Sequence, residues 1–152
     1  MRVWRICRRR FAASAWAGEG ARLYGGRWNS QGANVVYTST SLALAAIEVF
    51  VHLEPNLRPD DLVSIAADLP AGLPTTRIDP AALPSNWESR RDESLTRFGD
   101  DWLRAAKTAA LLVPSAAVRG EWNVLLNPAH AGFRKIELHR PRPFEFDLRM
   151  FR

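Results

Sequence analysis

The sequence of 152 residues has few of the residues that form cross-links or bind metals. Its single cysteine, Cys7, has no partner for an internal disulfide bond. The three histidines, His52, His130 and His139, do not fall at metal-ligand spacing with one another or with Cys7. We therefore expect a protein that works without a bound metal.

Long apolar segments are also missing. The most apolar one, residues 42–53, contains Glu48 and His52 and is shorter than the ~18 residues of a membrane span. The N-terminus carries Arg2 but no apolar stretch of the kind found in secretory signals. These absences predict a cytoplasmic protein that does not bind a membrane.

Lysine is nearly absent, although the chain is basic. Only Lys107 and Lys135 are lysines among the 21 basic residues; the net charge is +5 and the pI is near 10.3. This charge permits a nucleic-acid-binding module without catalytic activity, and we keep that as the alternative hypothesis. Arginine is equally suited to bind a small phosphorylated ligand or an acidic protein partner, so the charge alone does not distinguish these partners from a nucleic acid.

The composition is that of one globular domain, which we place at residues 1–152: 47% of the residues are apolar and 24% are charged. Strand-like segments outnumber helical ones and alternate irregularly with them, so we expect an α+β fold with mixed β-sheets and a few packed helices. The expected strands are residues 3–7, 35–38, 62–69, 111–113, 124–126, 135–138 and 144–148. The expected helical segments are residues 11–16, 42–53 and 99–109. Gly18 and Gly20 would end the first helical segment, Gly99 would begin the last, and residues 70–84, with four prolines, would be mostly loop.

Glu48 stands in the middle of the most apolar helix. Helical spacing places one apolar stripe on Leu42, Ala45, Ala46, Val49, Phe50 and Leu53, with Leu44, Ile47 and Val51 opposite. A helix that is apolar all round is expected to be buried all round. A buried carboxylate is costly unless it is paired or hydrogen-bonded. Glu48 is therefore either half of a structural ion pair or a carboxylate at the wall of a functional cleft.

A glycine turn precedes this helix. The run Gly25-Gly26-Arg27-Trp28-Asn29 lacks the Lys-Ser or Lys-Thr ending of a phosphate loop, but its glycines allow close backbone approach. Arg22 and Arg27 have the chemistry to bind a pyrophosphate, whereas Trp28 is equally suited to the core. Tyr37 is either a core residue or a platform for a flat ring.

A serine follows the strand expected at residues 111–113. Ser115 has no Gly-x-Ser-x-Gly elbow around it, so we interpret it as a capping or orienting residue and not as a nucleophile. Asn123 and Asn127 can tie loops through bonds from side chain to backbone.

Taken in order, these motifs resemble the RES domain, which is named for its Arg, Glu and Ser. Arg27, Glu48 and Ser115 fall where the named residues belong, and Tyr37 lies between the first two. The resemblance covers nearly the whole chain and is weakest at residues 70–97. Its other matching elements are the Gly-Gly-Arg-Trp-Asn run, Leu-Val-Pro-Ser at 112–115, Asn123, Asn-Pro at 127–128 and Phe-Asp-Leu-Arg at 146–149.

The resemblance implies a toxin of a bacterial type II toxin–antitoxin system, with a fold like that of ADP-ribosyltransferases. Such a protein uses NAD⁺ as its substrate and needs no metal. It cleaves the nicotinamide–ribose bond and transfers ADP-ribose to water, phosphate or a protein side chain, and the acceptor stays open here. The implied partner is an Xre-like antitoxin with a helix-turn-helix domain, and DNA is bound only through that complex.

The resemblance also assigns roles to the residues singled out above. Positive charge builds on the ribose as nicotinamide leaves, and Glu48 would stabilise it. Tyr37 would position the nicotinamide, and Arg27 would hold the pyrophosphate or the ribose. The remaining substrate-binding candidates are Ser115, Arg22, Trp28 and Asn123.

Overall fold

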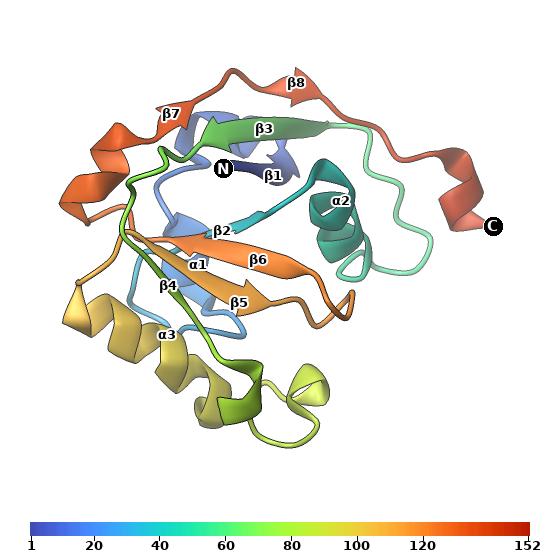
Figure 1. The fold of residues 1–152 in the computed structure, drawn as a ribbon. Helices are drawn as coiled ribbons and strands as arrows, with labels where there is room; N and C mark the ends of the chain where they lie inside the picture. Colours follow the sequence, from blue (N-terminus) through green and yellow to red (C-terminus); the bar gives the residue numbers. More distant parts are fainter.

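The computed structural model describes residues 1–152 and contains one mixed sheet with three α-helices (Figure 1). The strands are β1 (Arg2–Arg8), β2 (Val36–Ser39), β3 (Leu62–Asp68), β4 (Thr75–Arg77), β5 (Ala110–Pro114), β6 (Trp122–Leu126), β7 (Glu137–Leu138) and β8 (Arg142–Pro143). The α-helices are α1 (Glu19–Tyr24), α2 (Leu42–Phe50) and α3 (Glu93–Ala105), and short 3₁₀ turns cover Arg9–Ser14, Pro80–Ala82, Trp87–Ser89, Ala131–Lys135 and Leu148–Phe151. The strand order is β4-β5-β6-β2-β1-β3-β7, with β8 also on β3 and only β4–β5 parallel. The expected α+β fold is confirmed.

The sheet divides into two halves between β1 and β2. These strands share a single register pair, Trp4 with Ser39, whereas β1 pairs with β3 along its whole length. Figure 1 shows β1, β3, β7 and β8 on one side of this division and β2, β6, β5 and β4 on the other, with α2 beside the point where they diverge. The division therefore brings α2 against both halves of the sheet.

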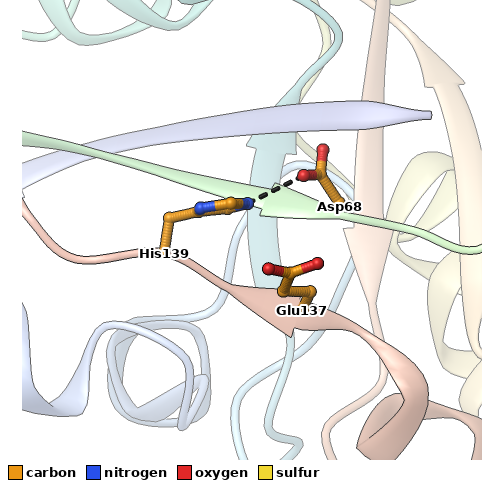
Figure 2. A group of neighbouring side chains, drawn as sticks. All are labelled: Asp68, Glu137 and His139. Carbon is orange, nitrogen blue, oxygen red and sulfur yellow. Dashed lines mark hydrogen bonds and ion pairs between the residues drawn. The ribbon is translucent and has the colours of Figure 1, made fainter.

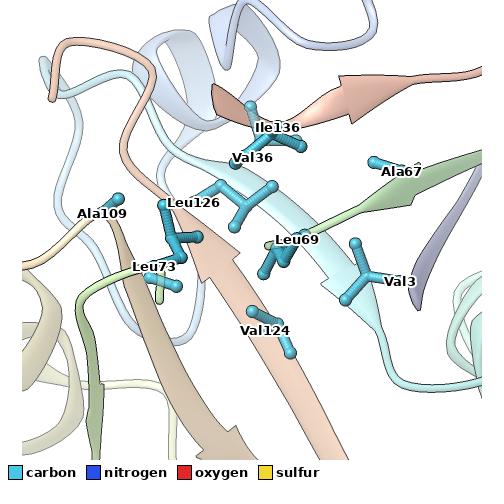
Figure 3. Close-up of a cluster of buried hydrophobic side chains, with 10 residues drawn as sticks. Val3, Val36, Ala67, Leu69, Leu73, Ala109, Val124, Leu126 and Ile136 are labelled. Carbon is cyan, nitrogen blue, oxygen red and sulfur yellow. The ribbon is translucent and has the colours of Figure 1, made fainter. Parts of the chain in front are cut away.

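Buried apolar side chains fill the space between the two halves. Val3 and Ala67 from one half meet Val36, Val124 and Leu126 from the other (Figure 3). The side chain of Leu125, between the last two, points to the opposite face of β6 and joins a second buried cluster under α3. Both faces of β6 are therefore covered over residues 124–126, which explains the apolar run at this end of the strand.

A polar cluster ties the edge of the sheet together. Asp68 at the end of β3 accepts two hydrogen bonds from Arg2 of β1, at 2.8 and 2.7 Å, and lies 2.8 Å from the His139 Nε2 atom. Glu137 of β7 completes the group (Figure 2). Hydrogen bonding to Arg2, and then to His139, holds the pKa of Asp68 well below its usual range. Since Arg2 contacts both carboxylate oxygens, we describe Arg2, Asp68 and His139 as an ion-pair network that joins β1, β3 and the residue after β7.

Helix α3 begins earlier than the sequence predicted. Asp92 caps it by accepting from the Ser94 N–H, so the helix runs through Gly99 and does not start there. Gly99 is needed inside the helix because a Cβ at this position would lie 1.8 Å from the Trp28 carbonyl oxygen. Gly20 likewise lies inside α1 and does not end a helix. In both cases a glycine predicted to mark a boundary is an interior residue.

Residues 144–148 do not form the predicted strand. The phenyl rings of Phe144 and Phe146 instead pack edge-to-face with their centroids 5.2 Å apart, and Phe146 lies 5.7 Å from Phe50 at the end of α2. Aromatic packing against α2 thus replaces strand pairing for this segment.

Helix α2 is only partly buried, in contrast to the prediction. Ser41 caps it, because its side chain accepts a hydrogen bond from the Leu44 N–H at 3.1 Å. The predicted stripe packs against the sheet and the C-terminal phenylalanines, but only Leu44 and Ala45 are fully buried and Val51 is 54% exposed. The other side of α2 is therefore exposed only in part, at Val51, whereas Leu44 is buried. None of the helices has both the length and the apolar character needed to cross a membrane.

Candidate functional site

A cavity of about 860 Å³ lies beside α2, in the size range of small-molecule sites. Its walls come from β1, the glycine turn, β2, α2, β6 and the loop before α3. Five of the predicted site residues line it: Arg27, Trp28, Tyr37, Glu48 and Asn123. The structure thus brings the arginine, the tyrosine and the glutamate to one cavity, although 21 residues separate the first from the last in the sequence.

Two donors from another part of the chain fix the carboxylate of Glu48. Its Oε1 atom accepts hydrogen bonds from Ser115 Oγ at 2.7 Å and from Asn123 Nδ2 at 2.6 Å. The Oε2 atom receives no hydrogen bond from the protein. One carboxylate oxygen therefore orients the group, and the other is free for a ligand.

The two donors are themselves held in place. Ser115 is 1% exposed, and its oxygen accepts the N–H groups of Ala117 and Val118 at 3.2 and 3.0 Å. The Oδ1 atom of Asn123 accepts from Ser39 Oγ at 2.7 Å. Ser115 thus orients Glu48, in agreement with its interpretation as a capping or orienting residue, and it does not line the cavity where the resemblance placed it among the substrate-binding candidates.

Tyr37 is bound to the glycine turn by its hydroxyl group. The hydroxyl donates to Asn29 Oδ1 at 2.6 Å and accepts from the Trp28 N–H at 3.2 Å. A Cβ on Gly26 would lie 2.5 Å from this hydroxyl, so the second glycine of the turn is required for the contact. Burial raises the pKa of Tyr37. The phenol therefore stays protonated and keeps its ring fixed at the cavity wall.

Arg27 is held by backbone carbonyls and not by an acid. Its Nη1 atom donates to the carbonyl oxygens of Trp87 at 3.1 Å and Arg90 at 2.5 Å. Burial lowers the pKa of Arg27, and the nearby Arg91 charge lowers it further, against the opposing effect of Glu48. Since Arg27 forms no ion pair, its charge is available to a ligand.

Trp28 serves mainly as a core residue. It is 2% exposed and packs against Trp87, with a centroid distance of 5.7 Å, and against Phe98 at 6.5 Å. Arg22 does not reach the cavity, because its guanidinium group pairs with Glu19 on the surface of α1. Of the two arginines expected to have the chemistry to bind a pyrophosphate, only Arg27 therefore lines the cavity.

Three cavity residues had no assigned role in the sequence analysis. Arg5 of β1 donates from Nη1 to the Tyr37 carbonyl at 3.0 Å, while its Nε atom is buried without a partner. Burial lowers the pKa of Arg5. Arg91 lines the cavity from the loop before α3, and His52 lines it one helical turn after Glu48. No motif in the sequence marked Arg5, Arg91 or His52 as residues of this cavity.

The fold and the cavity thus define an α+β protein whose binding cavity is built around a fixed carboxylate. Residues 2–148 match the RES domain family. The chain therefore belongs to the RES domain family of toxins, as the motifs predicted.

Curated relatives cover nearly the whole chain. A protein named Toxin Res from Photorhabdus laumondii is 38% identical over 136 residues, covering 89% of this chain and 86% of that protein. Toxin Res from Yersinia enterocolitica is 35% identical over 152 residues, covering 99% of each. The Prs ADP-ribosylating toxin of a Sphingobium species is 35% identical over 154 residues, covering 98% of this chain and 96% of that protein.

The fold also matches a solved structure. A chain in the crystal structure of the M. tuberculosis MbcT–MbcA toxin–antitoxin complex superposes with a TM-score of 0.71, covering 95% of this chain and 84% of that chain. At 16% sequence identity this likeness shows the fold alone.

Proposed function

We propose that this protein is the toxin of a toxin–antitoxin system and that it cleaves the nicotinamide–ribose bond of NAD⁺. One observation carries the proposal: Ser115 and Asn123 fix the Glu48 carboxylate at a cavity that Arg27 and Tyr37 also line. The relative named as an ADP-ribosylating toxin supports the choice of NAD⁺, because ADP-ribose transfer begins with this bond.

The residues of the cavity match the charge changes of the reaction. When the bond breaks, its electron pair leaves with the nicotinamide nitrogen, and positive charge develops on the ribose. The Glu48 carboxylate stabilises this charge, and its free Oε2 atom can accept a hydrogen bond from a ribose hydroxyl. Arg27 binds the pyrophosphate, and the Tyr37 ring offers a flat surface to the nicotinamide.

The acceptor of the ADP-ribose completes the reaction. Attack by water gives free ADP-ribose and a proton, and attack by phosphate gives the corresponding phosphate ester. Attack by a protein side chain gives a modified protein, which is the product that the name of the Sphingobium relative describes for that protein. We retain all three acceptors and separate them by experiment.

The test is incubation of the purified protein with NAD⁺, with and without phosphate and with and without a cell lysate. Chromatography of the nucleotides and intact mass measurement of the proteins distinguish the three products. We expect Glu48→Gln to lose activity at least 100-fold, since it keeps the hydrogen-bond acceptor but removes the charge (~1.4 kcal/mol corresponds to tenfold in rate). Glu145→Gln, at an exposed carboxylate outside the cavity, is the matched control. Equal activity in wild type and Glu48→Gln would refute the assignment.

We further propose an Xre-like antitoxin with a helix-turn-helix domain as the partner, and an acidic segment of it as the part that enters the cavity. Arg27 would bind a carboxylate there as it binds a phosphate. Affinity should then fall with added salt and on deletion of the acidic segment. If the full-length and truncated antitoxins bind equally well at every salt concentration, the acidic segment does not enter the cavity.

The nucleic-acid-binding alternative gains no support from the arrangement of the arginines. Seven of them pair with carboxylates on the surface, which reduces the free charge available to phosphates: Arg2, Arg8, Arg22, Arg90, Arg104, Arg119 and Arg149. We therefore propose that DNA is contacted only through the antitoxin.

A further inference from the structure

Two adjacent arginines in the loop before α3 have different surroundings. Arg90 pairs with Asp92, with 3.0 Å between Nη2 and Oδ2. Arg91 lines the cavity and has no carboxylate within ion-pair distance. The only acid that this loop brings to the cavity, Glu88, faces the Arg119 guanidinium at 3.6 Å. Arg91 is therefore a free cation at the cavity.

Arg27 is bound to the backbone of the loop that carries Arg91. Arg27 donates to the carbonyl oxygen of Arg90, the residue that precedes Arg91, and to that of Trp87. The ring of Trp87 packs on Trp28, which follows Arg27. Hydrogen bonds and ring packing thus join the glycine turn and the loop into one wall that carries two arginines.

The two charges are close enough to affect each other. Burial lowers the pKa of Arg27 and of His52, and the charge of Arg91 lowers each of them further, against the opposing effect of Glu48. Two positive charges that line one cavity, neither of them in an ion pair, favour a ligand with two negative charges. A pyrophosphate carries two such charges on adjacent groups, and guanidinium groups bind phosphate oxygens in pairs.

We infer that Arg91 is the second phosphate-binding residue of the cavity and that, with Arg27, it binds the pyrophosphate of the dinucleotide. This inference rests on the proposed function and gives Arg91 the role that the sequence analysis assigned to Arg22. Arg91 makes no hydrogen bond or ion pair with Glu48. Its contribution is therefore to substrate binding more than to bond cleavage.

The probe for this inference is ADP-ribose, which has the pyrophosphate but no nicotinamide–ribose bond to cleave. Titration calorimetry should show about tenfold weaker binding to Arg91→Gln than to wild type, because one charged contact is lost. Arg97→Gln removes an exposed, unpaired charge of α3 that does not line the cavity, and it should bind within about twofold of wild type. With NAD⁺ as substrate, Arg91→Gln should raise KM more than it lowers kcat.

The outcomes separate this inference from the proposed function. If Arg91→Gln binds ADP-ribose as wild type does, or if Arg97→Gln weakens binding equally, Arg91 has no specific role. If wild type binds ADP-ribose in the Arg91-dependent way but does not cleave NAD⁺, the Arg91 site stands and the proposed reaction fails. If NAD⁺ is cleaved with the same KM in wild type and Arg91→Gln, only the inference fails.

Discussion

Ser115 Oγ donates a 2.7 Å hydrogen bond to Glu48 Oε1, which joins the residue after β5 to the middle of α2. The same oxygen accepts two backbone N–H groups from the following loop. One buried hydroxyl thus sets both the direction of the carboxylate and the shape of the loop.

Ser115→Ala should lower both stability and turnover. The substitution leaves two backbone N–H groups without an acceptor and removes one donor to a carboxylate, so we expect unfolding in urea to show a loss of about 2 kcal/mol. If Ser115 orients Glu48, kcat for NAD⁺ should fall roughly 10- to 100-fold with little change in KM. Ser14→Ala, at an exposed serine, is the control. Reduced stability with unchanged kcat would show that Ser115 has only a structural role.

Gly99→Ala should destabilise the protein, although alanine is the better helix former. The new Cβ would lie 1.8 Å from the Trp28 carbonyl oxygen, so α3 and the glycine turn must move apart. We expect a cost of about 1–3 kcal/mol in the free energy of unfolding. Gly20→Ala, in α1 with nothing within 4 Å of its Cβ position, should instead stabilise by roughly 0.5 kcal/mol. The prediction fails if thermal denaturation gives the same sign for both variants.

Acid should destabilise the sheet edge through Asp68. The pKa of this carboxyl is lowered in the folded state by Arg2 and then His139, whereas an unfolded aspartate titrates near ~3.9. The stabilisation is therefore complete above that value and is lost as the pH falls through the folded-state pKa. Between pH 5 and pH 2, roughly, the Tm of wild type should drop more than that of Asp68→Asn. Asp60→Asn, which removes a carboxyl outside any ion pair, should follow wild type.

Alkali should ionise Tyr37 only when the protein unfolds. Burial raises its pKa in the folded state, so this group stabilises the fold below the unfolded value of ~10, and that contribution is lost at higher pH. The variant Tyr24→Phe leaves Tyr37 as the only tyrosine. Its phenolate absorbance should rise together with the loss of the circular dichroism signal. A phenolate signal from protein that keeps its native circular dichroism would contradict the buried hydrogen bond to Asn29.

Local sequence patterns were sufficient to predict most strands and the helix that carries Glu48. The runs at 35–38, 62–69 and 124–126 form strands because β-branched and apolar residues pack on both faces of the divided sheet. The stripe on α2 packs as predicted, because helical periodicity reports burial directly. The ordered motifs also singled out Arg27, Tyr37 and Glu48, and the structure places all three at one cavity.

Other features depend on contacts between distant residues, which local patterns do not report. Gly99 is required because α3 passes close to the backbone of Trp28, which lies 71 residues earlier in the sequence. It does not mark a helix boundary. Phe144 and Phe146 pack on α2 although they have the composition of a strand. Arg91 reaches the cavity from a segment with no recognisable motif. In each case the deciding partner is brought near only by the complete fold.

The carbonyl oxygens of Trp87 and Arg90 that accept from Arg27 have a consequence for the thermodynamics of binding. A free arginine loses about 2 kcal/mol of rotamer entropy when it is immobilised, and here that loss accompanies folding. An anion that meets Arg27 finds a side chain that is already ordered, so little further entropy is lost on contact. Ordering Arg27 therefore lowers the stability of the empty protein and reduces the entropic penalty of ligand binding.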